Sequence, residues 1–255
     1  MWTREFLKNR AKAVLKVSYW KAFLISLIIA ISGGGGNRSS NFNWNFNNHT
    51  STNGFTPFTK ATTDMFPFLL LITFIILFVI VLFALAFRIF LGYPLEVGAR
   101  RFFVQSAQNN TDMNYLGYAF GNGRYFNIIK TMVWRGILTF IYFLLLIVPG
   151  IIKSYAYRMV PYILSDNPNI DCKRALELSD KMTDGEKMNM WVLDLSFIGW
   201  YILGSILLFI GVLFVMPYEN ATKAELYLVL RKNALDHGLC SDEDFGLKQP
   251  LYTNL

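Results

Sequence analysis

Charged residues and cysteines are scarce in this sequence. Asp, Glu, Lys and Arg make up 16% of its 255 residues, whereas an ordinary soluble domain carries about 25%. Hydrophobic residues make up 54%. This balance argues against an ordinary soluble protein and places the chain among membrane proteins. The two cysteines, Cys172 and Cys240, lie in polar segments expected on the cytoplasmic side, where no disulfide framework is expected.

The sequence also lacks the motifs of common enzymes. It contains no His-Glu-x-x-His motif of a zinc protease and no Gly-x-Ser-x-Gly nucleophile elbow. The two histidines, His49 and His237, lie far apart in the chain, and neither cysteine has metal-ligand spacing. The glycines of 33–36 are not followed by the Gly-Lys-Ser/Thr of a phosphate loop. We therefore expect a protein without catalytic activity, cofactor or metal.

Positive charge lies beside the apolar segments of the chain. Lys and Arg number 24 and Asp and Glu 17, which gives a formal net charge of +7. A nucleic-acid-binding protein concentrates such charge on one face of a soluble domain. A membrane therefore explains the basic clusters better, and no nucleic-acid partner is expected.

The first basic cluster lies in residues 2–17, which have the periodicity of an amphipathic helix. Such a helix suits the anionic headgroup layer of a lipid bilayer. The alternative is a solvated helix that leads into the first span. The apolar face is formed by Phe6, Leu7, Ala11, Val14 and Leu15, and the polar face by Glu5, Lys8, Lys12 and Lys16.

The first apolar run, Ala22–Ile31, is shorter than the roughly 20 residues of a transmembrane helix. To cross the membrane, the helix must also include residues 17–21 and part of the glycine run of 33–36. A signal peptide would also fit, but the segment before the run is unusually long and amphipathic, which favours an uncleaved anchor. Residues 33–66 are rich in Gly, Asn, Ser and Thr, so they predict a flexible extracytoplasmic loop.

The remaining apolar segments differ in how strongly they predict a transmembrane helix. The strongest is Pro67–Leu91, which is uncharged until Arg88 near its end. Residues 95–130 predict short interfacial helices on the cytoplasmic side. Thr131–Val148 should end at Pro149-Gly150, and Ile151–Leu164 is too polar to assign from hydropathy alone. Trp191–Met216 fits one tilted helix or the first half of a hairpin that turns near 211–217, with Glu219–Leu230 as its return.

These segments predict an all-α membrane protein, a multi-pass helical bundle of six transmembrane helices preceded by the amphipathic helix. Residues 1–235 form one integral-membrane domain, and 236–255 form a polar cytoplasmic tail, of which the closing residues 241–255 are expected to be disordered. Lys and Arg gather before the first span and in the predicted inner loops, so the positive-inside rule places the N-terminus in the cytoplasm. An even number of crossings brings the C-terminus back there. Five crossings are a weaker prediction because Arg231 and Lys232 would then lie outside.

Charged residues at membrane depth are the candidates for a functional site, because burying a charge there costs about 2.5 to 3.5 kcal/mol. Asp194 and Arg158 are placed to meet across helices, and Glu219 precedes Lys223 by one helical turn. One interpretation is a substrate-binding site or ion path lined by these four residues together with Asn220, Thr222 and Glu225. The other interpretation, which we favour, is that the two pairs neutralise each other and fix helix packing.

Several short motifs are distributed along most of the chain. They are Arg4-Glu5-x-Leu7-Lys8-x-Arg10-Ala11-Lys12, Tyr19-Trp20-Lys21-Ala22, Pro94-Leu95-x-x-Gly98, Met159-Val160-Pro161-Tyr162, Ser165-Asp166-Asn167-Pro168, Ala175, Ser179, Gly185, Leu195-Ser196-Phe197-Ile198-Gly199-Trp200 and Pro217-Tyr218-x-x-Ala221. As a set, they resemble an uncharacterised family of bacterial integral membrane proteins, domain-of-unknown-function family 975. The resemblance implies a multi-pass bacterial membrane protein and supplies no established activity.

Two hypotheses for function follow. The first is a non-enzymatic accessory, scaffold or envelope-associated factor of the bacterial cell membrane, with anionic lipid and a membrane protein as its partners. The second is a small transporter or permease subunit that uses the polar residues inside the bundle.

Overall fold

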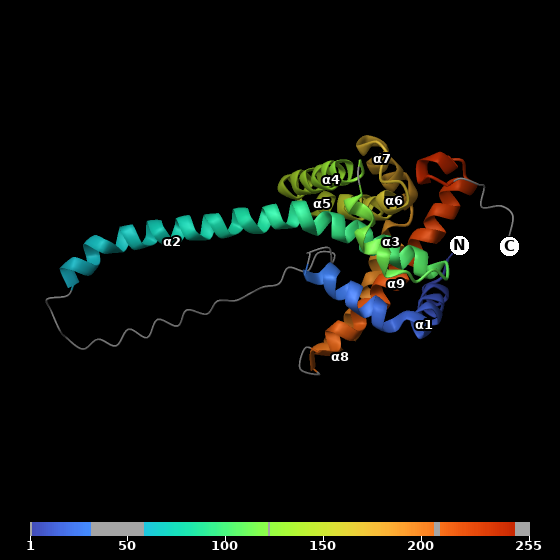
Figure 1. Cartoon of the computed structure of the whole chain (residues 1–255), viewed down its shortest axis with the longest axis horizontal. Helices are drawn as coiled ribbons and strands as arrows, with labels where there is room; N and C mark the ends of the chain where they lie inside the picture. The colour runs from blue at the N-terminus through green and yellow to red at the C-terminus, as the bar shows by residue number, and fades with distance from the viewer. Residues whose placement is uncertain (1, 32–58, 122, 207–209, 248–255) are drawn as a thin grey trace.

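The computed structural model describes residues 2–31, 59–121, 123–206 and 210–247, and this part of the chain contains helices and turns without strands. Most of the predicted loop of 33–66 and the end of the predicted tail lie outside the described residues. Figure 1 shows the helices. They are α1 (Arg4–Ile31), α2 (Thr59–Phe87), η1 (Arg88–Gly92), α3 (Tyr93–Ala107), η2 (Met113–Phe120), α4 (Tyr125–Leu145), α5 (Ile147–Ala156), α6 (Val160–Asp166), α7 (Cys172–Thr183), α8 (Lys187–Ile206), α9 (Ile210–Asp236) and η3 (Asp242–Phe245).

Two helices are long and apolar enough to cross a membrane: Leu70–Ala107, which continues from α2 into α3, and Tyr125–Leu145. A third is added if the two halves of α1 count as one span. The all-α prediction is therefore confirmed, whereas only two or three of the six predicted spans meet this criterion. The segment predicted as the fourth span is divided between the 10 residues of α5 and the 7 of α6.

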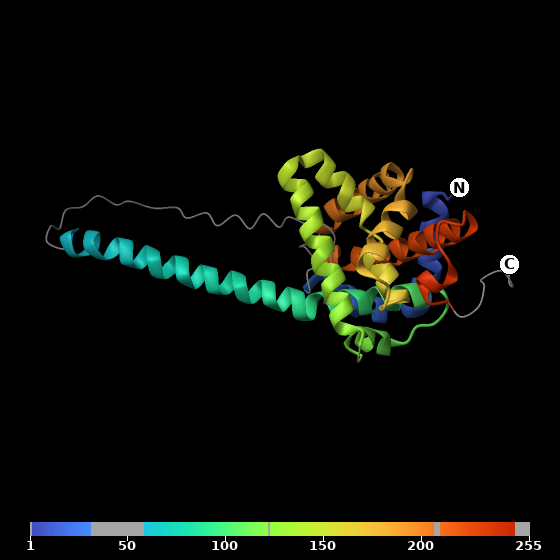
Figure 2. The same cartoon turned by 90° about the horizontal axis from the view of Figure 1, so that it is seen from above.

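Helix α2 projects from the bundle in both views (Figures 1 and 2). Every side chain from Leu70 to Phe87 is exposed, which suits contact with lipid tails. The helix begins at Thr59, so the prediction that the loop extends to residue 66 is wrong at its end. Residues 60–66 contain no glycine or proline, so they can form a helix, and Pro67 lies inside α2.

The predicted amphipathic helix is present as the first half of α1, and Ser18 separates it from the apolar second half at a bend of 107°. Leu7, Ala11 and Leu15 of its apolar face are buried in the hydrophobic core of the bundle, and α1 packs chiefly against α9. These three side chains are therefore covered by protein, whereas Phe6 of the same face is 47% exposed. Its basic face, with Lys12 and Lys16, stays exposed.

The turn between α4 and α5 lies at Leu146, which is extended at φ −160° and ψ 143°. The prediction that Pro149-Gly150 would stop the helix is thus wrong by a few residues. Pro149 lies in the first turn of α5, where its missing N–H breaks no helical hydrogen bond. A Cβ at Gly150 would lie 2.6 Å from the Phe143 ring, so glycine permits the close packing of the two helices.

The last two helices form a hairpin rather than one tilted helix. Helix α8 ends at Ile206 and α9 begins at Ile210, so residues 211–217, the predicted turn, are helical and Pro217 lies inside α9. Gly204 and Gly211 face each other, and a Cβ on Gly204 would lie 2.8 Å from the Gly211 backbone. Such small residues allow helices to pack closely within a membrane.

The beginning of the predicted disordered tail is folded. Residues Asp242–Phe245 form the short helix η3, which a capping box at Ser241 begins. Phe245 is 1% exposed and packs against Tyr227, and the Asp244 carboxylate accepts hydrogen bonds of 3.0 and 2.7 Å from the Arg174 guanidinium. The prediction of disorder is therefore wrong for these residues, which an apolar anchor and an ion pair hold against α7 and α9.

Candidate functional site

The candidate site begins at the break between α5 and α6, where Arg158 lies. A side chain of helix α7 forms hydrogen bonds with backbone groups at this break. The buried Ser179 hydroxyl donates to the Ala156 carbonyl at 2.6 Å and accepts from the Met159 N–H at 3.2 Å. Because these groups cannot bond within a helix at the break, Ser179 fixes the backbone on both sides of Arg158.

Arg158 meets Asp194 of α8, as predicted from the sequence. Its two terminal nitrogens lie 2.7 and 2.8 Å from the two carboxylate oxygens, which is the paired geometry that arginine and carboxylate favour. The Tyr155 hydroxyl also donates to Asp194, at 3.0 Å. Asp194 is therefore held by two groups from the region of α5.

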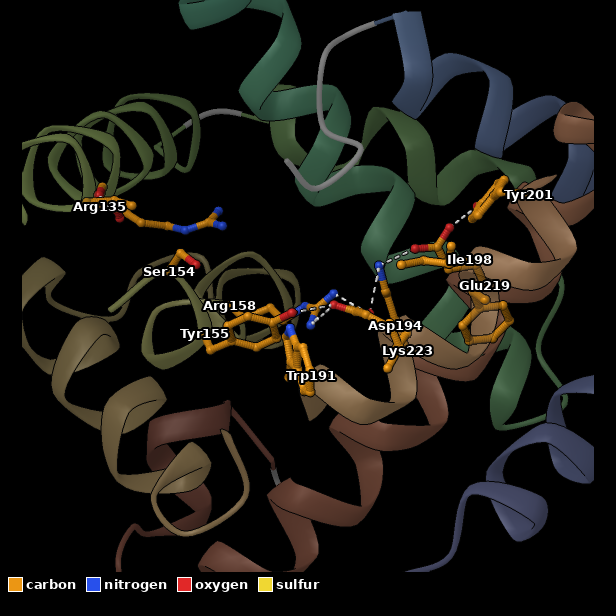
Figure 3. Close-up of a pocket in the computed structure, with 13 residues that line it drawn as sticks. Arg135, Ser154, Tyr155, Arg158, Trp191, Asp194, Ile198, Tyr201, Glu219 and Lys223 are labelled. Atoms are coloured by element: carbon orange, nitrogen blue, oxygen red, sulfur yellow. Dashed lines mark hydrogen bonds and ion pairs between the residues drawn. The ribbon is translucent and has the colours of Figure 1, made fainter. Parts of the chain in front are cut away.

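The second predicted pair lies on α9 and is joined to the first. Lys223 Nζ lies 2.5 Å from Glu219 and 3.7 Å from Asp194. The Tyr201 hydroxyl of α8 donates to Glu219. All four predicted site residues thus belong to one network that joins α5, α8 and α9 (Figure 3).

This network forms part of the wall of a cavity of about 370 Å³ between the α4/α5 and α8/α9 hairpins. The four charged side chains are 11% to 27% exposed, so they are neither fully solvated nor fully enclosed. The lining is Arg135, Thr139, Ser154, Tyr155, Arg158, Trp191, Asp194, Leu195, Phe197, Ile198, Tyr201, Glu219 and Lys223.

Arg135, Tyr155 and Tyr201 are site residues that sequence reasoning missed. Arg135 is a cation within the otherwise apolar segment predicted as the third span. A charged residue inside a span is a candidate functional residue, so this position could have identified it. The two tyrosines carried no comparable signal. Their hydroxyls reach carboxylates that lie 39 and 18 residues further along the chain.

Three other predicted lining residues lie elsewhere. Glu225 is buried beside Arg10, whose Nε is 3.0 Å from its carboxylate. Asn220 accepts from Arg100 at 2.8 Å and donates to Ser26 at 3.0 Å. The Thr222 hydroxyl donates to the backbone of its own helix. Glu225 and Asn220 therefore join α9 to α1 and α3, and none of the three residues lines the cavity.

The cavity wall carries several charged side chains, and most of them are paired with an opposite charge. Both carboxylates in its wall accept hydrogen bonds or ion pairs from cations and tyrosines. Within the described ranges, no three His, Cys, Asp or Glu side chains come together as metal ligands. The arrangement can orient a polar ligand, and its charged donors can bind an oxyanion.

The comparison with protein families identifies one match, and no curated protein or solved structure matches the chain. The matching family is described as "Protein of unknown function (DUF975)", and its match covers residues 41–234. This range includes the α4/α5 hairpin, α8, all but the last two residues of α9 and the whole cavity wall, whereas α1 lies outside it. Because the match covers well over half of the sequence, the chain belongs to the DUF975 family.

Proposed function

We propose that this chain is a non-enzymatic, multi-pass protein of the bacterial cell membrane that acts as an accessory, scaffold or envelope-associated factor. The observation that carries this proposal is the pairing of charges inside the bundle. Asp194 is held by two cations and a tyrosine, and Glu219 by a cation and a tyrosine, which suits side chains that fix helix packing. Removing one partner of such a pair is costly, whereas the intact pair is tolerated at depth.

The proposed topology has six crossings with both termini in the cytoplasm. The crossings are the second half of α1, α2, α4, α5 with α6, α8 and α9. Pairing of Arg158 with Asp194 and of Lys223 with Glu219 supports the less apolar crossings, because each cation then enters the membrane with a counter-charge.

The proposed lipid contact is the exposed basic face of α1. Arg4, Lys12 and Lys16 are exposed there, and the apolar face of the same helix packs on the bundle. The bundle thus holds the cations in place, and an anionic cytoplasmic leaflet attracts them.

An affinity purification from mild detergent, with the native lipids retained, tests the proposal. We expect a defined partner subunit to co-purify with the wild-type chain. The double variant Glu219→Gln/Lys223→Gln serves as the matched control, because it removes both charges of one pair together. If the pair is structural, this variant keeps the same partner. A chain that purifies alone would count against the accessory role.

The second candidate is a small transporter or permease subunit, which the cavity between the two hairpins favours. Transporter sites lie near the membrane midplane between such helical units. A transporter would purify with a bound solute and no partner subunit, and the double variant would lose that solute while still folding. The same purification therefore separates the two functions.

A further inference from the structure

Arg135 is the one arginine in the lining of the cavity that the ion-pair network leaves out. It is the middle residue of α4, one of the two helices long and apolar enough to cross a membrane. A cation at this depth is unfavourable unless a partner neutralises it. In Figure 3 the Arg135 side chain extends from α4 with no hydrogen bond or ion pair to the other residues drawn.

No described carboxylate forms an ion pair with Arg135. The contact of its guanidinium is with the Met132 sulfur at 3.8 Å, which is a weak acceptor for a group with five N–H donors. Glu96 of α3 lies 3.9 Å from Arg100 on its own helix and is not within ion-pair distance of Arg135.

The rest of the cavity wall carries no spare negative charge. Asp194 is shared by Arg158 and Lys223, and Glu219 binds Lys223. With Arg135 included, three cations face two carboxylates, so the lining has a net charge of +1 when all five groups are ionised. One bound anion would bring the lining to neutrality.

We propose that the Arg135 side of this cavity binds a small anion with one carboxylate or phosphate group. The planar guanidinium matches either group through two parallel hydrogen bonds. The Ser154 and Thr139 hydroxyls also line the cavity, but each donates its proton to a carbonyl of its own helix, so a hydroxyl would have to rotate to donate to the anion. A volume of about 370 Å³ lies at the small end of ligand sites. This inference goes beyond the proposed function, which assigns the internal charges to packing and names no ligand.

The anion can come from solution or from the headgroup of an anionic lipid. Thermal unfolding of the full-length chain distinguishes these sources. One arm uses inorganic phosphate with the protein in a neutral detergent, against sodium chloride of the same ionic strength. The other arm uses nanodiscs of phosphatidylcholine with and without phosphatidylglycerol. Each arm compares wild type with Arg135→Gln, Arg135→Lys and Lys130→Gln, the last of which removes an exposed cation from the same helix.

We expect at least one probe to raise the unfolding midpoint of wild type and of Lys130→Gln by about 2 °C or more. Arg135→Gln should lose this shift, and Arg135→Lys should bind about tenfold more weakly because it lacks the paired donors. A response to phosphate identifies a soluble anion, and a response to phosphatidylglycerol alone identifies a lipid headgroup. Equal shifts in wild type and Arg135→Gln, or no shift in either arm, would overturn the proposal.

Discussion

The Lys223 ammonium group lies between two carboxylates, 2.5 Å from Glu219 on its own helix and 3.7 Å from Asp194 on α8. This position makes Lys223 the link between the two ion pairs that line the cavity. Without it, Asp194 would keep Arg158 and Glu219 would keep Tyr201, but the two pairs would no longer share a residue.

We predict that Lys223→Gln destabilises the chain more than Glu219→Gln/Lys223→Gln does. The single change leaves the Glu219 charge without its cation, which should cost about 2 kcal/mol. This is less than the usual cost of breaking a fully buried pair, because these side chains are partly exposed. The double change removes both charges, so its effect should be smaller than that of Lys223→Gln alone. Thermal unfolding in detergent measures the order, and a reversed order would contradict the pairing seen here.

The two charge pairs could be predicted from the sequence, because one follows from helical spacing and the other from the cost of burying an unpaired charge. Glu219 and Lys223 stand one turn apart on a helix, and Asp194 and Arg158 are costly to bury singly. The cavity was not predictable in the same way. Its wall combines α4, α5, α8 and α9, and the distances between these helices follow from packing that no spacing in the sequence reveals.

The errors in the predicted fold also have physical causes. The sequence predicts helix breaks at Pro149 and near Pro217, but a proline fits the first turn of α5, and Pro217 lies buried inside α9. The polar composition of residues 241–247 predicted disorder, yet Phe245 supplies an apolar anchor for them. Composition averages over a segment and therefore misses a single buried ring.

A substitution at Gly204 tests the tight contact at the end of the last hairpin. A Cβ there would lie 2.8 Å from the Gly211 backbone, which cannot move aside as a flexible side chain can. We therefore expect Gly204→Ala to destabilise the chain by about 1 to 3 kcal/mol. Gly199→Ala on the same helix is the control, because no atom lies within 4 Å of its added Cβ. It should be neutral or slightly stabilising, and equal effects at both positions would refute the close contact.

The Arg174–Asp244 pair predicts how acid affects the terminal segment. Hydrogen bonding from Arg174 lowers the pKa of Asp244 below its ordinary value of 3.8. A carboxylate with a lowered folded-state pKa stabilises the fold above its unfolded pKa, and that stability is lost as the pH falls through the folded value. The advantage of wild type over Asp244→Asn should thus be full at pH 6 and should shrink below about pH 4.

Unfolding midpoints across this pH range measure that advantage. Glu243→Gln is the matched control, since Glu243 is an exposed acid in the same turn and its carboxylate takes no part in the Arg174 contact. Its midpoint should follow wild type at every pH. A constant difference between wild type and Asp244→Asn down to pH 2 would show that the ion pair does not hold η3.

Basic residues of α1 should determine which lipids remain bound to the purified chain. Lys12→Gln/Lys16→Gln removes two exposed cations and leaves the buried Leu7 and Ala11 contacts intact. We expect the ratio of retained phosphatidylglycerol to phosphatidylethanolamine to fall several-fold, because each such cation contributes about 1 kcal/mol near an anionic surface. Mass spectrometry of the extracted lipids measures the ratio, and Lys232→Gln, at an exposed position on α9, controls for net charge.

Alkylation of Cys240 offers a direct readout of whether the terminal segment is docked. Burial, with help from the Asp244 charge, raises the pKa of the Cys240 thiol to about 11. Because the thiolate is the reactive form, the thiol should react slowly with iodoacetamide at pH 8. Asp244→Asn removes the contact with Arg174, exposes the segment and should increase the rate about tenfold or more, towards that of a free thiol of pKa about 8.5. Mass spectrometry of the Cys240 peptide follows the rate, and the Glu243→Gln chain should react as slowly as wild type. Fast modification of the wild-type thiol would mean that η3 is not held against α7 and α9.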